Sequence, residues 1–150
     1  MQNVLKTVDI LVSEQAFDSW SSLFGNSSTS AISSLLKVLE NLSASLEGDF
    51  SISTPHILLN RSCISTFNLA HLSSSDSITI TDSNQTNVSI TAVTFSTLGR
   101  LMPSQALSSS QENSIINADV ILVKVNQSLS HELSVRFKKK DTSRARTICV

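Results

Sequence analysis

A histidine two residues before a serine is the arrangement in this sequence that could carry covalent chemistry. In His71-Leu72-Ser73 the imidazole can accept the hydroxyl proton, and the serine oxygen can then attack the Leu72 carbonyl to form an ester that water hydrolyses. Such self-cleavage needs a strained, buried turn, whereas the Ser-rich run at 73–77 predicts an exposed loop. Cleavage between Leu72 and Ser73 is therefore a minor hypothesis, and we expect no catalytic residue and no enzyme activity.

Cofactor and metal motifs are absent from the sequence. A phosphate loop or dinucleotide fingerprint needs closely spaced glycines, and the chain has three scattered ones, Gly25, Gly48 and Gly99. The histidines are equally far apart, at His56, His71 and His131, and neither CxxC nor HExxH occurs. We predict no cofactor and no metal ligand.

Basic residues gather near the end of the sequence. Six of the 11 lysines and arginines fall between positions 136 and 146, where Asp141 is the one acidic residue. The segment 136–146 is interpreted either as a contact for glycosaminoglycans, lipid head groups or an acidic partner, or as a solvated loop between two strands. The net charge of −1 and the lack of interleaved aromatic residues argue against nucleic-acid binding.

The sequence holds six Asn-x-Ser/Thr acceptor patterns for N-glycosylation, at Asn26, Asn41, Asn60, Asn84, Asn87 and Asn126. With 10 asparagines, 31 serines and 12 threonines, chance gives about three, so either a Ser-rich composition or real glycosylation accounts for them. Glycosylation requires the secretory route, and on that interpretation Met1 is expected to be a cut point. Cys63 and Cys149 suit the same compartment, either paired together or each with a partner outside the sequence.

Two helical patterns occupy the first third of the chain. Its 150 residues and 16.2 kDa suit one compact domain or two small subdomains. Apolar residues recur at helical spacing from Val4 to Phe24, and again from Ile32 to Leu46. The second pattern predicts a helix over 30–47 that packs on the first and places Asn41 opposite its apolar stripe. No apolar run approaches the roughly 20 residues of a membrane span.

After Asp49 the apolar residues alternate as in strands. Strands are predicted at 57–59, 78–81, 88–91, 120–125 and 133–137, with a further strand beginning at 147–150. The alternation slips by one position at 92–95, which predicts a bulge or a bend, and the segment 103–117 is expected to be a loop. The predicted fold class is α+β, with helices followed by an antiparallel β-sandwich that is incomplete at its C-terminal end.

The order of these segments resembles a known extracellular domain. The helix pair, Ile52-Ser53-Thr54-Pro55-His56-Ile57, Ala92-Val93-Thr94-Phe95-Ser96-Thr97-Leu98, Val120-Ile121-Leu122-Val123-Lys124-Val125, Leu133-Ser134-Val135-Arg136-Phe137 and Thr147-Ile148-Cys149-Val150 are similar to the GAIN domain of adhesion G-protein-coupled receptors. With the Ser19-Trp20 stretch included, they are most similar to subfamily F (group VI).

The resemblance implies both a domain organisation and a function. Residues 1–48 would be the end of helical subdomain A, and residues 50–150 would be β-sandwich subdomain B without its final strands. Cys149 would be the first cysteine of the proteolysis site, with its disulfide partner downstream, and His71-Leu72-Ser73 does not align with the cleavage tripeptide. The expected role is a scaffold that holds a tethered agonist on the extracellular side of the plasma membrane, with a G protein engaged only by a transmembrane domain outside this sequence. The alternative is a secreted glycan-binding module, or a decoy ectodomain, that uses the segment 136–146.

Overall fold

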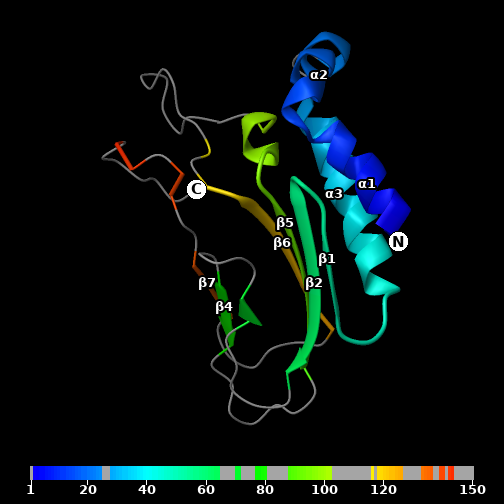
Figure 1. Ribbon diagram of the computed structural model, residues 1–150, viewed down its shortest axis with the longest axis vertical. Coiled ribbons are helices and arrows are strands. Elements are labelled where there is room, and N and C mark those ends of the chain that lie inside the picture. Colours follow the sequence, from blue (N-terminus) through cyan, green and yellow to red (C-terminus); the bar gives the residue numbers. More distant parts are fainter. Residues whose placement is uncertain are drawn as a thin grey trace.

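The computed structural model describes residues 2–24, 28–64, 70–71, 77–80, 88–102, 116, 118–126, 133–136, 139–140 and 142–143. These residues form three layers (Figure 1): helices cover one face of a larger sheet, and a smaller sheet lies against its other face. The chain passes from the helical layer to the sheets near residue 49, and this explains why the apolar residues change there from helical to alternating spacing.

Four helical elements precede the first strand. The helix α1 spans Gln2–Leu11, the 3-10 helix η1 Glu14–Ala16, α2 Phe17–Phe24 and α3 Ser28–Ala44. The predicted helical region at 4–24 thus contains a bend at 13–16, and Trp20 of α2 reaches back to donate its Nε1–H to the Leu11 carbonyl at 2.7 Å. After α3 the chain turns through Gly48, whose φ of 75° is the left-handed conformation that glycine adopts without strain.

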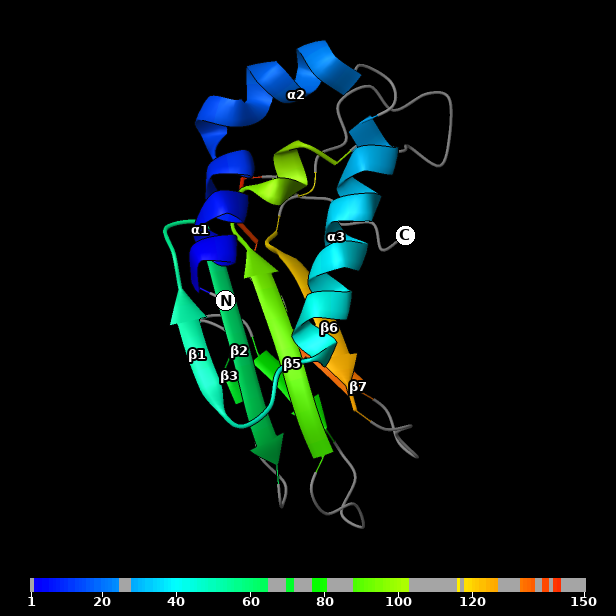
Figure 2. The same cartoon turned by 90° about the vertical axis from the view of Figure 1, so that its right-hand side faces the viewer.

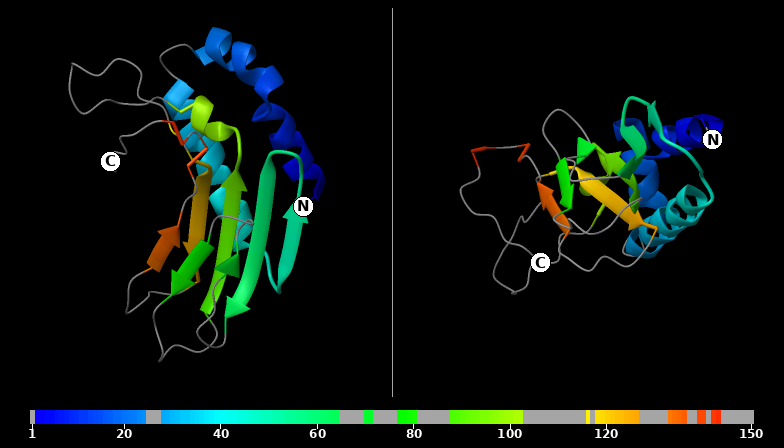
Figure 3. Two further views of the ribbon diagram at one scale, coloured as in Figure 1. Left: turned by 60° about the vertical axis from the view of Figure 1, so that its left-hand side comes forward. Right: turned by 90° about the horizontal axis from the view of Figure 1, so that it is seen from below.

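The larger sheet contains β1 (Phe50–Ser53), β2 (Ile57–Ile64), β5 (Val88–Phe95) and β6 (Val120–Val125), in the order β1-β2-β5-β6. All of its pairings are antiparallel. The smaller sheet orders β3 (Ala70–His71), β4 (Ser77–Ile80) and β7 (Leu133–Arg136) as β3-β4-β7. Figure 3 shows the smaller sheet beside the end of the larger sheet where β5 begins.

Two apolar clusters lie on the two faces of the larger sheet. On the helix side, residues from α1 and α3 pack on sheet residues, and the buried members are Leu5, Val8, Val12, Ile32, Leu39, Ile57, Leu59, Val93, Phe95 and Leu98. On the opposite face, Val88, Ile90 and Ala92 pack with partly buried residues that include Val135 of the smaller sheet. The helices and the larger sheet therefore share one core, and the two sheets share another.

The predicted bulge at 92–95 is wrong. The strand β5 pairs with β2 without interruption from Ile57↔Phe95 to Ile64↔Val88. Every residue of β5 is buried, because one face of the strand meets the helices and the other meets the smaller sheet. A strand covered on both faces has no reason to alternate, and this explains the slip in the pattern.

The predicted α+β fold, with helices followed by antiparallel strands, is confirmed. Among the described helices, none combines the length and the hydropathy that a bilayer-spanning segment requires. The 3-10 helix η3 (Leu98–Arg100) follows β5 and lies between α1 and α3 (Figure 2), so the end of β5 is where the helices meet the sheet.

Candidate functional site: the junction between helices and sheet

Polar contacts gather where β5 ends and β2 begins. We call this region the junction. It consists of Asp9, Val12, Glu14, Thr54, His56, Ser96, Thr97, Arg100, Asp119 and Lys140. Among the described residues no three His, Cys, Asp or Glu side chains come together as a metal site would require. The junction therefore joins chain segments through hydrogen bonds and ion pairs.

Asp9 attaches α1 to the turn between β1 and β2. Its side chain lies in the α1 face that also carries the buried Leu5 and Val8, and the residue is 8% exposed. Its Oδ1 accepts a hydrogen bond from the Thr54 hydroxyl at 2.6 Å and another from the His56 backbone N–H at 2.8 Å. A buried carboxylate is tolerable only when such donors replace the lost water. The burial of Asp9 therefore depends on the donors of the turn, and these donors depend on Asp9 as their acceptor.

The turn itself is fixed by Thr54. The Thr54 N–H donates to the Ile57 carbonyl at 2.8 Å, and the Ile57 N–H donates to the Thr54 hydroxyl oxygen at 3.1 Å. Pro55 has no backbone N–H, so the backbone donor that the turn offers to Asp9 is the N–H of His56. The turn thus presents two donors to one carboxylate oxygen.

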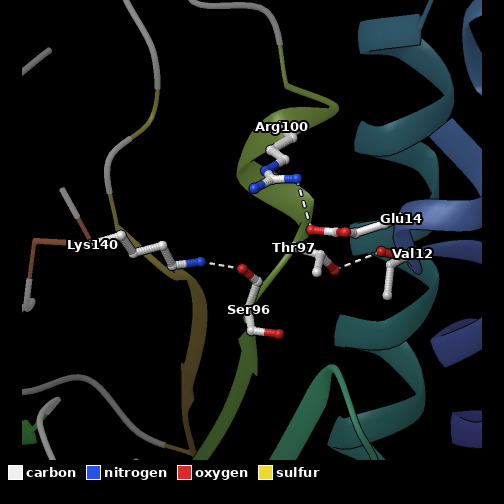
Figure 4. Close-up of polar contacts among 6 residues, drawn as sticks. All are labelled: Val12, Glu14, Ser96, Thr97, Arg100 and Lys140. Atoms are coloured by element: carbon white, nitrogen blue, oxygen red, sulfur yellow. Dashed lines mark hydrogen bonds and ion pairs between the residues drawn. The ribbon is translucent and has the colours of Figure 1, made fainter.

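Two further contacts join the chain just after α1 to the two ends of η3 (Figure 4). The Thr97 hydroxyl donates to the Val12 carbonyl at 2.5 Å, which satisfies one of the carbonyls left unpaired at a helix C-terminus. Arg100 forms an ion pair with Glu14 at 2.7 Å, but the two side chains are 67% and 61% exposed. Solvent screens such a pair, so it adds little to stability.

Lys140, which follows β7 in the sequence, also contacts the junction. Its Nζ lies 2.7 Å from Asp119 Oδ1 and also donates to the Ser96 carbonyl. Ser96 in turn donates its backbone N–H to the His56 carbonyl at 3.0 Å. Figure 4 shows Lys140 and Thr97 on opposite sides of the chain at Ser96, so this stretch contacts both α1 and the segment around residue 140.

A second polar row crosses the helix-facing side of the larger sheet, towards its other end. Arg61 Nη1 donates to Thr91 Oγ1 at 3.1 Å, and Lys124 lies across from Thr91 on β6. Lys124 Nζ is 3.6 Å from Glu40 Oε1 of α3. This row links α3 to β6, and none of these bonds involves a junction residue.

The described glycosylation candidates lie in three different environments. Asn41 is exposed on α3, as predicted for the back of that helix, and Asn126 is exposed immediately after β6. Asn126 Oδ1 accepts the Ser89 N–H at 2.9 Å, which leaves its nitrogen as the atom for a glycan. Asn60 is half-buried in the middle of β2, between Ser51 and Ala92 in neighbouring strands. Asn26, Asn84 and Asn87 lie outside the described residues.

The remaining candidate residues are only partly described. His71 ends β3, whereas Leu72 and Ser73 lie outside the described residues, so the cleavage hypothesis stays untested. Cys63 is exposed and is bonded to no described cysteine, and Cys149 lies outside the described part. Of the basic residues in the segment 136–146, the structure describes Arg136, Lys139 and Lys140, and all three are exposed.

The junction is not apparent from the sequence, because its members look like ordinary polar residues. One signal was available: Asp9 stands four positions after Leu5 and three before Val12, so it falls on the apolar stripe of the first helix. A charged residue on such a stripe needs a buried partner. The partners themselves, at 54 and 56, could not be identified from spacing because they lie about 45 positions along the chain.

Comparison with known proteins agrees with this architecture. Residues 43–150 match the family model described as GPS: GAIN subdomain B, which covers β1 to β7 and the C-terminal half of the junction. A search of curated proteins found no match. The match spans well over half of the sequence, and the chain therefore belongs to the GAIN subdomain B family, the type of region found in adhesion G-protein-coupled receptors.

Proposed function

We propose that the chain is an extracellular scaffold of an adhesion G-protein-coupled receptor, of subfamily F, and that it holds a downstream tethered agonist segment until ligand or force removes it. The match over 43–150 carries this proposal. In this role the chain is a non-catalytic glycoprotein, and its partners are the proteolysis-site strands that follow it and an extracellular ligand. It acts on a G protein only through a transmembrane domain.

The edge of the larger sheet supports a holding role. Among the described strands, β6 pairs with β5 alone. Five of its six residues have apolar side chains, and these lie on both faces of the sheet: Val120, Ile121, Leu122, Val123 and Val125. An apolar edge strand with unpaired backbone groups is a template for another strand. We propose that the sequence at and beyond 147–150 pairs there.

The direction in which the backbone N–H groups of β6 point identifies those that could bond to the added strand. Asn126 donates its N–H to the Ser89 carbonyl at 3.1 Å on β5, and the backbone direction alternates along an antiparallel strand. The N–H groups of residues 120, 122 and 124 therefore point to β5. Those of Ile121, Val123 and Val125 point to the outer edge.

Replacing Val123 by proline tests this proposal in the full-length receptor. Proline removes an outward N–H, which an edge strand tolerates, and leaves the bonds to β5 in place. We expect normal surface expression with raised basal signalling, because the held segment loses a backbone partner. The matched control is Val123→Ala, which shortens the same side chain and keeps the N–H. Equal signalling in the two variants would exclude strand addition at this edge.

The alternative role as a glycan-binding module is favoured by one observation, the exposure of Arg136 and Lys139. If they bind sulfated glycans, the double variant Arg136→Ala/Lys139→Ala elutes from heparin at lower salt than the parent chain. Unchanged elution would exclude glycan binding through these two residues.

A further inference from the structure

One hydrogen-bonded line crosses the junction from α1 to the segment after β7. It begins at the Asp9 carboxylate, which accepts the His56 N–H at 2.8 Å. The His56 carbonyl accepts the Ser96 N–H at 3.0 Å, and the Ser96 carbonyl accepts from Lys140 Nζ. The ion pair between Lys140 and Asp119 ends the line.

The charged ends of this line match the direction of its bonds. The anionic Asp9 accepts the His56 N–H and the cationic Lys140 donates to the Ser96 carbonyl, so every donor in the line points towards Asp9. The line is buried at Asp9, which is 8% exposed, and reaches solvent at its other end, where the Lys140 and Asp119 side chains are 44% and 21% exposed. Water screens this ion pair less than the Arg100–Glu14 pair, whose side chains are 67% and 61% exposed.

The line bypasses the apolar core. The described contacts of α1 with the sheet are mostly apolar, whereas Lys140 contacts the junction through its ammonium group. Lys139, the neighbouring lysine, is exposed. Lys140 therefore connects this segment to the same residues that α1 contacts.

We propose that Lys140 is a positioning residue that couples the docking of α1 to the placement of residues 139–143, with His56 and Ser96 as the connection. When α1 leaves the turn at 54–57, the Ser96 carbonyl loses its fixed position and the segment loosens. The coupling lies within this chain and does not depend on the proposed function; only its consequence for the tethered agonist rests on that proposal.

Amide hydrogen exchange in the intact protein tests the coupling from both ends. In Lys140→Met we expect exchange in the 54–57 turn and in α1 to rise about fivefold, the lower range of measured coupling between sites. In Asp9→Ala we expect a similar rise in peptides that contain residues 139–143, because coupling is reciprocal. Lys140→Arg should restore the parent rates, since it keeps the charge and the donors.

Two control variants separate coupling from general loosening. Lys139→Met removes an adjacent lysine, and Glu14→Gln breaks the exposed ion pair of the junction; both should leave the distant exchange rates unchanged. Unchanged exchange at α1 in Lys140→Met would overturn the proposal. In Lys140→Met, an even rise over all strands, or a rise equal to that of Lys139→Met, would overturn it as well. Confirmed coupling without any change in receptor signalling would count against the proposed function and leave the coupling intact.

Discussion

Asp9 and His56 are 47 positions apart, and the Asp9 carboxylate accepts the His56 backbone N–H at 2.8 Å. This bond places the first helix on the turn that opens β2. The His56 carbonyl already accepts the Ser96 N–H, so the bond to Asp9 satisfies the other backbone group of His56, its N–H. The helical part and the sheet are therefore connected by a specific polar contact as well as by the shared core.

Removal of this carboxylate should destabilise the fold. In Asp9→Ala the His56 N–H and the Thr54 hydroxyl lose their buried acceptor, which costs about 1–3 kcal/mol. Urea denaturation followed by circular dichroism measures the free energy of unfolding. Glu14→Ala serves as the control, because its ion pair is mostly exposed and its loss should cost less than about 1 kcal/mol. Equal losses in both variants would show that the Asp9 bonds are not the main contact.

The shared core should be more sensitive than any polar contact. Phe95 is 0% exposed and belongs to the cluster that joins helices and sheet, so Phe95→Ala should lower the free energy of unfolding by about 3–5 kcal/mol. Val38 on α3 is 61% exposed, and Val38→Ala should change it by no more than about 0.5 kcal/mol. The same urea titration compares the two, and a small effect at Phe95 would contradict the continuous core.

The sequence predicts the elements well and their junction poorly. Helical spacing identified α3 and the exposed back that carries Asn41, because one apolar stripe on a helix faces one core. The pattern failed at β5, where burial on both faces removes the alternation. The bond from Thr97 to Val12 joins residues 85 positions apart, and no local rule specifies such a pair.

Glycan occupancy should follow exposure among the described acceptor sites. Asn41 and Asn126 are exposed, whereas Asn60 faces the second core beside Ala92, which is 2% exposed. In protein secreted from mammalian cells we expect glycans at Asn41 and Asn126 and none at Asn60. Peptide mass spectrometry with and without glycosidase measures each site.

Two variants serve as controls for these sites. Ser128→Ala removes the acceptor pattern at Asn126 and keeps the bond from the Ser89 N–H to its Oδ1, so it should abolish that glycan without loss of stability. Asn41→Gln does the same on α3, where the side chain is exposed. A glycan found at Asn60 would mean that the face of β2 towards the smaller sheet is open in solution.

The thiol of Cys63 should react in the folded protein. Cys63 is exposed on β2 and is bonded to no described cysteine, and its backbone N–H donates to Asp49 Oδ1 at 2.7 Å. If Cys149 pairs with a downstream cysteine, as the resemblance to GAIN domains implies, Cys63 stays reduced. A maleimide added to native, unreduced protein should then label Cys63 fully, with Cys63→Ser as the control. Labelling only after reduction would instead show that Cys63 is paired, and peptide mapping of the unreduced protein would identify whether Cys149 is its partner.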